Sequence, residues 1–313
     1  MKTDQDLIII GAGGAGLSAA QYGARGNLRT LVLEELSSGG QALLIDNLEN
    51  YPGFPDSVTG FDFTQKMEDQ ARKFGAQFEN AAVSGLRKED GHFVVETDRG
   101  PLTSLTVILA TGAKHKTLGV PGEAELSGRG VSYCATCDGP FFKGKRMLVV
   151  GGGDAACDEA TYLSHLAESI LMIHRRDRFR AQKAVAARVL ANPKITVRFN
   201  TELRRIEGDK AVKSVTLFNN ATGKECQEDV SAVFVFIGSD PQVQLVKSMN
   251  LPLDDGGYIE TNQRMETSVS GLYAVGDVRA SPFRQLVVAA GEGAVAAHAA
   301  GQYIDETRGE KYS

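Results

Sequence analysis

The chain of 313 residues has no excess of positive charge, because 34 lysines and arginines stand against 39 aspartates and glutamates. The net charge of −5 argues against nucleic acid as a partner, since phosphate neutralisation needs a basic surplus. Apolar runs of the ~20 residues that span a bilayer are missing too. The charged start, Met1–Asp6, lacks the apolar run of a signal peptide. We therefore expect a cytoplasmic protein without a membrane segment.

Cysteine is also scarce, with four residues at positions 134, 137, 157 and 226. So few cysteines in so long a chain do not make a disulfide scaffold. A zinc site would need a second close pair beside Cys134 and Cys137, and Cys157 and Cys226 lie too far apart in sequence to supply one. We therefore expect no metal. Cys157 should be a packed, small apolar side chain, and Cys226 has no visible partner.

Strand and helix patterns alternate along the chain, which favours an α/β fold. Apolar runs at 7–10 and 146–150 predict the first buried strands of two successive units. A helix expected near 60–74 should bury one face made of Phe63, Met67, Ala71 and Phe74.

The length exceeds what one hydrophobic core usually holds, so we expect two domains. Residues 248–313 contain too little to form a domain alone and should return to complete the first one. We place the first domain at residues 1–116 and 246–313. The second domain, residues 117–245, is then inserted into the first.

A strand, a glycine turn and a helix open each domain. The motif G-x-G-x-x-G occurs at Gly11–Gly16, and a variant ending in alanine occurs at Gly151–Ala156. Such turns let a pyrophosphate approach the backbone at a helix N-terminus. One match alone is weak evidence, but here the strand and helix context repeats. We predict two Rossmann-like, three-layer dinucleotide-binding domains, with cofactor contacts at Gly11, Gly13, Gly14, Ala15, Gly16, Gly151, Gly153, Asp154, Ala155 and Ala156.

The residues that follow the second strand of each domain differ in charge. Glu34 follows that strand in the first domain, and an acid there accepts hydrogen bonds from ribose hydroxyls. In the second domain the same place begins the run His174–Arg180. Arginine forks make charge-assisted bonds to a 2′-phosphate, each worth about 1.5–3 kcal/mol. We predict NADPH there, held by His174, Arg175, Arg176 and Arg180; the alternative is a solvated basic loop.

The pair Cys134 and Cys137 precedes the second glycine turn. Two cysteines at this spacing can close a disulfide, and the spacing commonly lowers the pKa of one thiol. The neighbouring Asp138 would not lower that pKa, because a nearby anion disfavours thiolate. It suits a proton donor or acceptor for the leaving thiolate. Two dinucleotide sites and a dithiol together indicate an electron relay.

The chain closely resembles the low-molecular-weight bacterial thioredoxin reductases from end to end. The glycine turns, the cysteine motif Cys134–Gly139 and the run His174–Arg180 carry part of this resemblance. The rest of it is carried by Gly39–Gln41, Glu49–Gly53, Ala110–Gly112, Gly276-Asp277 and Arg284-Gln285. Departures are modest. Ala155 stands where a hydroxyl residue is usual, Cys157 replaces a common aliphatic residue, and Leu286 replaces a frequent alanine.

The resemblance implies FAD in the first domain, NADPH in the inserted domain, and a homodimer. It implies that electrons pass from NADPH through FAD to the Cys134–Cys137 disulfide and on to thioredoxin. Cys137 would lie beside the flavin ring, and Cys134 would attack thioredoxin. The further FAD contacts that it implies are Glu34, Glu35, Gly40, Gln41, Asn50, Val83, Thr111, Gly112, Gly276, Asp277, Arg284, Gln285 and Leu286.

Three alternatives remain open from the sequence. The first is a flavoenzyme that reduces another redoxin or a small disulfide. A second takes its electrons from NADH or ferredoxin, although the arginine run argues against that. A third is a non-catalytic flavin sensor that uses Cys134 and Cys137 as a redox switch.

Overall fold

The computed structural model describes residues 3–45, 48 and 50–309. The chain forms two compact units. The first combines residues 1–114 with 240–313, and the second consists of residues 115–239. The second unit is thus an insertion in the first. Within the described residues, no helix is both long and apolar enough to cross a membrane.

The first unit is built on a seven-stranded sheet with the order β3-β2-β1-β6-β5-β4, and β17 also pairs with β6. The strands β1, β2, β3, β6 and β17 pair in parallel, whereas β5 pairs antiparallel with both β4 and β6. The bounds are β1 (Gln5–Ile10), β2 (Thr30–Glu34), β3 (Gln77–Asn80), β4 (Val83–Glu89), β5 (His92–Thr97), β6 (Gly100–Leu109) and β17 (Leu272–Ala274).

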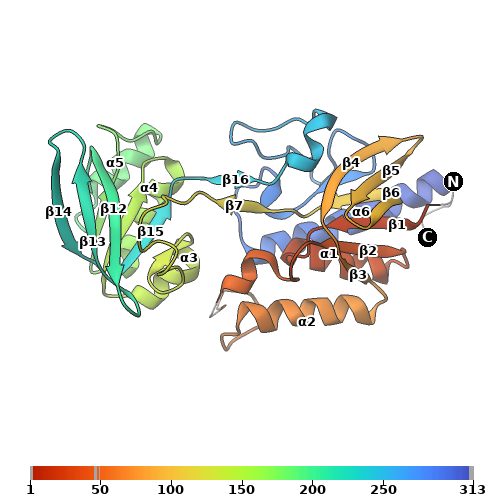
Figure 1. The fold of residues 1–313 in the computed structure, drawn as a ribbon, viewed down its shortest axis with the longest axis horizontal. Coiled ribbons are helices and arrows are strands. Elements are labelled where there is room, and N and C mark those ends of the chain that lie inside the picture. Colours follow the sequence, from red (N-terminus) through yellow and green to blue (C-terminus); the bar gives the residue numbers. More distant parts are fainter. Residues whose placement is uncertain (1–2, 46–47, 49, 310–313) are drawn as a thin grey trace. The chain divides into compact units, whose positions relative to one another are not determined.

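Alternate side chains of β1 enter two separate cores, which explains its continuous apolar run. Leu7 and Ile9 pack with residues of the helices α1 (Gly14–Arg25) and α6 (Leu286–Arg308). Ile8 and Ile10 pack with residues of β4 and β5. One face of the sheet is therefore covered by helices and the other by the antiparallel strands (Figure 1).

The helix expected near 60–74 is α2 (Gly60–Lys73), and Thr59 caps it by accepting the N–H of Asp62 at 3.0 Å. Phe63 and Ala71 are buried as expected. The expectation for Phe74 was wrong, because its side chain is 42% exposed. The helix has already ended there, so Phe74 turns outward and lies under the guanidinium of Arg25.

The second unit contains a parallel sheet with the order β11-β10-β9-β15-β8. The bounds are β8 (Val131–Ser132), β9 (Arg146–Gly151), β10 (Ser169–Ile173), β11 (Ile195–Arg198) and β15 (Ala232–Phe236). The helices are α3 (Ala135–Asp138), α4 (Asp154–Leu166) and α5 (Lys183–Ala191). The antiparallel strands are β12 (Thr201–Gly208), β13 (Val212–Asn219) and β14 (Lys224–Asp229).

This unit repeats the layering of the first. Met147 and Val149 of β9 pack with residues of α4, whereas Leu148 and Val150 pack with residues of β12 and β13 (Figure 1). The two units together confirm the expected fold class of two parallel-sheet, Rossmann-like domains.

The chain crosses between the units through β7 (Ala113–His115) and β16 (Ser239–Pro241), which pair with each other. The return to the first unit comes at Asp240, earlier than the 245/246 boundary we expected. The chain already belongs to the first unit here, because the N–H of Gln242 donates to the carbonyl of Gly112, a residue of that unit, at 2.9 Å.

Candidate active site

The first glycine turn joins β1 to α1 in the first unit. Gly11 has a φ of +103°, and an added Cβ there would lie 2.5 Å from the carbonyl oxygen of Ala110. A Cβ at Gly16 would lie 1.9 Å from the oxygen of Gly11, so neither position accepts a side chain. A Cβ at Gly13, in contrast, would meet no atom within 4 Å. The turn is thus tight on its inner side and open at Gly13, as close approach of a pyrophosphate requires.

Glu34 ends β2 beside this turn. Its carboxylate accepts the backbone N–H of Ala12 at 2.9 Å and that of Leu36 at 3.1 Å. Each carboxylate oxygen has two lone pairs, so both can still accept a ribose hydroxyl. Glu34 pairs with Asn80 across the sheet, which places Val83, three residues further on, near this edge. Glu35 follows Glu34 on the exposed side.

The segment Arg284–Leu286 makes three contacts, of which the one at Leu286 is with the same turn. The guanidinium of Arg284 lies 3.9 Å from the ring centroid of Tyr258. Asn50 Nδ2 donates to Gln285 Oε1 at 3.0 Å, which joins two of the predicted FAD residues. The side chain of Leu286 lies over Gly14, where an added Cβ would come within 2.2 Å of it. The leucine that departs from the family pattern therefore fits because Gly14 has no side chain.

The remaining predicted FAD residues lie on segments that meet the turn from other sides. Gly39 N–H donates to the carbonyl of Ala12 at 2.7 Å, and this brings Gly40 and Gln41 to the glycine turn. Gln41 Nε2 donates to the carbonyl of Ala113 at 2.6 Å. Thr111 Oγ1 donates to the carbonyl of Gln242 at 2.8 Å. Of the motif residues quoted above, Glu49 lies outside the described residues.

The second glycine turn joins β9 to α4. Gly151 packs so closely that a Cβ would lie 2.5 Å from the carbonyl oxygen of Phe236, whereas Gly153 opens onto free space. The N–H of Arg180 donates to the carbonyl of Gly152 at 2.7 Å. The arginine run is thus tied to the glycine turn, so that one dinucleotide can reach both.

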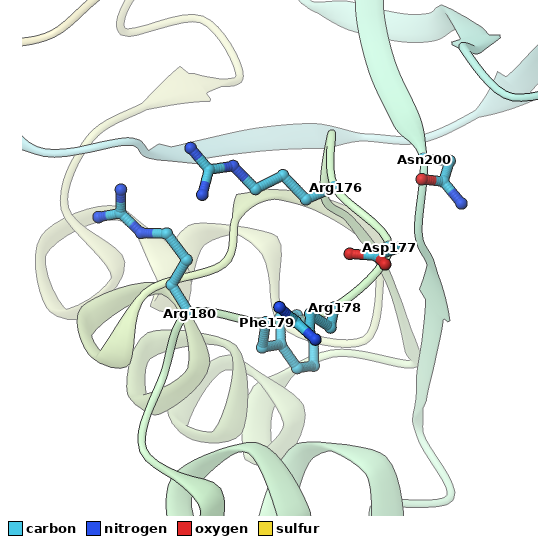
Figure 2. A pocket seen from close by; sticks show the side chains of 6 residues that line it. All are labelled: Arg176, Asp177, Arg178, Phe179, Arg180 and Asn200. Carbon is cyan, nitrogen blue, oxygen red and sulfur yellow. The ribbon is translucent and has the colours of Figure 1, made fainter.

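A pocket of about 500 Å³ opens along the arginine run. Figure 2 shows Arg176 and Arg180 extending toward the same side of it. The residues that line the pocket are Arg176, Asp177, Arg178, Phe179, Arg180 and Asn200. Asp177, Arg178, Phe179 and Asn200 were not among our predicted contacts. Asn200 lies on a distant stretch of sequence, and its N–H donates to the carbonyl of Arg176 at 2.9 Å.

Two of the predicted NADPH residues lie away from this lining. Arg175 is exposed, and its carbonyl accepts a hydrogen bond from Asn220 Nδ2 at 2.9 Å. The ring of His174 packs against Gly152, where a Cβ would come within 2.3 Å of it. Burial, followed by the charges of Arg176, Arg175 and Arg180, lowers the pKa of His174. The lowered pKa favours the neutral form of the His174 imidazole.

Cys134 and Cys137 form a disulfide in the second unit. Cys134 caps the short helix α3, and the N–H of Cys137 points to its Sγ at 3.3 Å. The hydroxyl of Thr136 lies 3.5 Å from the same sulfur. After reduction, these two groups would be placed to stabilise a thiolate at Cys134 by hydrogen bonding. Asp138 ends α3, and its N–H donates to the carbonyl of Cys134 at 3.2 Å.

The strand that leads into the disulfide is anchored by Glu123. This buried carboxylate accepts the hydroxyl of Tyr133 at 2.9 Å and the N–H of Gly119 at 2.7 Å. Burial and the bond to Glu123 raise the pKa of Tyr133. The ring of His115 stacks on Tyr133 at 5.3 Å between centroids. The residue directly before Cys134 is thus held in one position.

The other two cysteines lie apart from this disulfide. Cys157 is fully buried in α4, and burial raises the pKa of its thiol to about 11, so it stays protonated as an apolar group. This confirms the packing expected for it. Cys226 is exposed on β14.

Two nucleotide-type turns and a redox-active cysteine pair define the class of nucleotide-dependent disulfide oxidoreductases. Residues 5–294 match the model of the pyridine nucleotide-disulphide oxidoreductase family. A thioredoxin reductase of Treponema pallidum is 53% identical over 97% of this chain and 99% of its own length. One of Bacillus subtilis is 43% identical over 96% and 95%. The crystal structure of thioredoxin reductase from Streptococcus pyogenes superposes with a TM-score of 0.91 at 39% identity, covering 96% of this chain and 98% of that one.

The chain therefore belongs to the pyridine nucleotide-disulphide oxidoreductase family and, within it, to the low-molecular-weight bacterial thioredoxin reductases. This confirms the resemblance read from the motifs. Membership implies FAD and NAD(P)H as cofactors, and the residues present fit both. Each glycine turn is open at one glycine, one turn lies beside a carboxylate, and the other lies beside a pocket of guanidinium groups.

Proposed function

We propose that this enzyme uses NADPH to reduce the disulfide of a thioredoxin through its own Cys134–Cys137 pair. The observation that carries the proposal is this disulfide on the unit that also holds the arginine-lined pocket. Bound FAD would supply the two-electron link between NADPH and the disulfide. The residues of the protein would bind and orient the two cofactors and exchange protons with the reacting groups.

The first unit would bind FAD at the turn Gly11–Gly16, with the Glu34 carboxylate at the ribose. The remainder of the FAD molecule would be surrounded by the loops of Gly40 and Gln41, of Asp277 and of Arg284–Leu286. The second unit would bind NADPH at Gly151–Ala156, with its 2′-phosphate between Arg176 and Arg180. Two charge-assisted bonds of about 1.5–3 kcal/mol each favour NADPH over NADH by roughly two to four powers of ten.

Cys134 is the better nucleophile toward a protein partner, because the N–H of Cys137 and the hydroxyl of Thr136 stabilise its thiolate. Its attack on the thioredoxin disulfide forms a mixed disulfide and releases one thioredoxin thiolate. Cys137 then attacks Cys134, which restores the internal disulfide and releases the second thiolate. Asp138, at the end of α3, would act as the proton donor or acceptor for the sulfur that leaves as a thiolate.

The direct test is reduction of a purified thioredoxin from the same source. The reaction is monitored both as NADPH oxidation and as thiol release. We expect one NADPH oxidised per thioredoxin disulfide, and little turnover with NADH. A flavin-loaded enzyme that oxidises NADPH but reduces only small disulfides would replace this proposal by the first alternative. Electrons accepted from reduced ferredoxin but not from NADPH would favour the second.

Phe141 offers an apolar contact for the partner close to the dithiol. It follows Cys137 by one helical turn, in the segment Gly139–Phe142, and 46% of it is exposed. We expect Phe141→Ala to raise the KM for thioredoxin about tenfold, because a buried aromatic anchor is typically worth 1–2 kcal/mol or more. The rate with a small disulfide should stay unchanged. Leu190→Ala, equally apolar and exposed on α5, is the matched control.

We also propose a homodimer and a cytoplasmic location. Tyr22 and Phe74 are 46% and 42% exposed and flank Arg25 on the first unit, an apolar area suited to contact a second copy. Sedimentation should then give about twice the chain mass of 33.5 kDa. Reduction of a thioredoxin suits a compartment in which thiols are kept reduced.

A further inference from the structure

Glu292 is a charged side chain in the middle of α6, a helix made largely of alanine, glycine and valine. Only 9% of this side chain is exposed. A buried carboxylate destabilises a fold unless it is paired and hydrogen-bonded. Here both oxygens are used: Oε2 accepts the N–H of Gly276 at 2.7 Å, and Oε1 accepts Nη1 of Arg279.

Both members of this ion pair are held in place by further contacts. Arg279, whose side chain is 13% exposed, also donates from Nε to Thr261 Oγ1 at 2.7 Å. The helix that carries Glu292 is locked to α1. Ser18 Oγ donates to the carbonyl of Ala290 at 2.6 Å, and a Cβ at Gly293 would lie 2.1 Å from the oxygen of Ala15. Glu292 therefore stands at a fixed distance from the first glycine turn.

Glu292 accepts the N–H of the peptide between Val275 and Gly276, one residue before Asp277. Gly276 starts the turn Gly276–Val278 with a φ of +69°, and a Cβ there would lie 3.1 Å from Cβ of Ala15. The hydrogen bond from Gly276 to Glu292 sets the plane of the Val275–Gly276 peptide, and hence the direction in which the chain enters the turn that carries Asp277. Asp277 is among the residues predicted to contact FAD.

We propose that Glu292 and Arg279 are positioning residues of the FAD site. Glu292 orients the Gly276-Asp277 turn toward the flavin cofactor, and Arg279 cancels the carboxylate charge close to a ligand that is itself anionic. This inference rests on the proposed function, because it assigns the turn to FAD. It predicts that the charge of the pair, and not only its packing, controls FAD affinity.

The charge requirement separates three variants. Arg279→Met leaves the Glu292 carboxylate buried and unpaired beside the turn. Glu292→Gln keeps the shape and can still accept the Gly276 N–H, but it leaves a cation that an anionic ligand tolerates. The double variant Arg279→Met with Glu292→Gln has no charge left. FAD affinity should therefore fall most in Arg279→Met, and the second substitution should partly restore it.

The test is titration of flavin-free protein with FAD, with the dissociation constant read from flavin fluorescence and the unfolding temperature of each apoprotein measured in parallel. We expect Arg279→Met to weaken FAD binding by roughly 10-fold to 100-fold, the range for an unpaired buried charge. The double variant should bind more tightly than Arg279→Met. Glu89→Gln is the matched control, since Glu89 and its partner Arg87 are 52% and 46% exposed. It should leave the dissociation constant unchanged.

Equal FAD affinity in wild type, Arg279→Met and Glu292→Gln would overturn the inference, as would a double variant no better than Arg279→Met. Should Arg279→Met not fold, Arg279→Gln replaces it, because it also removes the positive charge, and unchanged affinity in that variant would be equally decisive. A wild-type protein that binds no FAD would instead refute the proposed function itself. The two failures are therefore distinguishable.

Discussion

Replacing either sulfur of the Cys134–Cys137 disulfide with oxygen should abolish thioredoxin reduction while the flavin stays bound. Serine cannot form a disulfide or act as a thiolate at neutral pH, so the relay ends at the flavin. We expect Cys134→Ser and Cys137→Ser to lower the rate by roughly a thousandfold or more, as loss of a nucleophile does in other enzymes. The measurement is NADPH-driven thiol release, with flavin absorbance to confirm cofactor retention.

The two serine variants should differ in what they trap. With Cys137 replaced, Cys134 can still attack the thioredoxin disulfide, but no second thiol resolves the mixed disulfide. A covalent adduct should then accumulate on a non-reducing gel with Cys137→Ser and not with Cys134→Ser. Cys226→Ser, at an exposed cysteine on β14, should keep the full rate. An adduct with Cys134→Ser alone would reverse the roles assigned to the two sulfurs.

Replacing Arg176 and Arg180 together with alanine should remove the preference for NADPH. Both guanidinium groups extend toward one side of the same pocket (Figure 2), an arrangement that suits binding of one phosphate by both. We expect kcat/KM for NADPH to fall by roughly 10²-fold to 10⁴-fold, because two charge-assisted bonds are lost. The value for NADH, which has no 2′-phosphate, should change by less than about threefold. Steady-state kinetics with both nucleotides measures this.

Arg188→Ala is the matched control for the clamp. Arg188 lies on α5 of the same unit, is 61% exposed and pairs with Asp158. It should leave both kcat/KM values unchanged. An equal loss for NADPH and NADH in the Arg176 and Arg180 double variant would show that these arginines serve the common part of the dinucleotide. Arg175→Ala should have the smaller effect, because Arg175 does not line the pocket.

Much of the site could be located from short motifs. The first glycine turn was recognisable because the clash of a Cβ with the turn itself is a local property of the backbone, as at Gly16, where the Cβ would meet the oxygen of Gly11. The cysteine pair was recognisable because two thiols three residues apart can meet within one helical turn. In both cases the physical cause acts over a few residues, so spacing alone carries the information.

Other features depended on contacts between distant segments. Asp177, Arg178, Phe179 and Asn200 line the pocket beside the predicted Arg176 and Arg180, whereas Arg175 does not. This arrangement depends on β11 and the turn after it, whose backbone is hydrogen-bonded to the arginine run. Phe74 has the spacing of a buried residue, yet it is exposed because its helix ends one residue earlier. From the sequence alone, Glu292 looks like a single charged residue that interrupts an apolar helix. Its partners Gly276 and Arg279 become visible only when α6 packs beside the turn.

The chain alone thus specified two nucleotide turns, a dithiol and the order of the two units, since these follow from steric limits and reactive groups within short windows. Three-dimensional packing chose which arginines line the pocket and which groups pair with the buried Glu292 carboxylate. Those choices depend on the direction of individual side chains and peptide planes. Such directions are set by neighbours that lie far away in sequence.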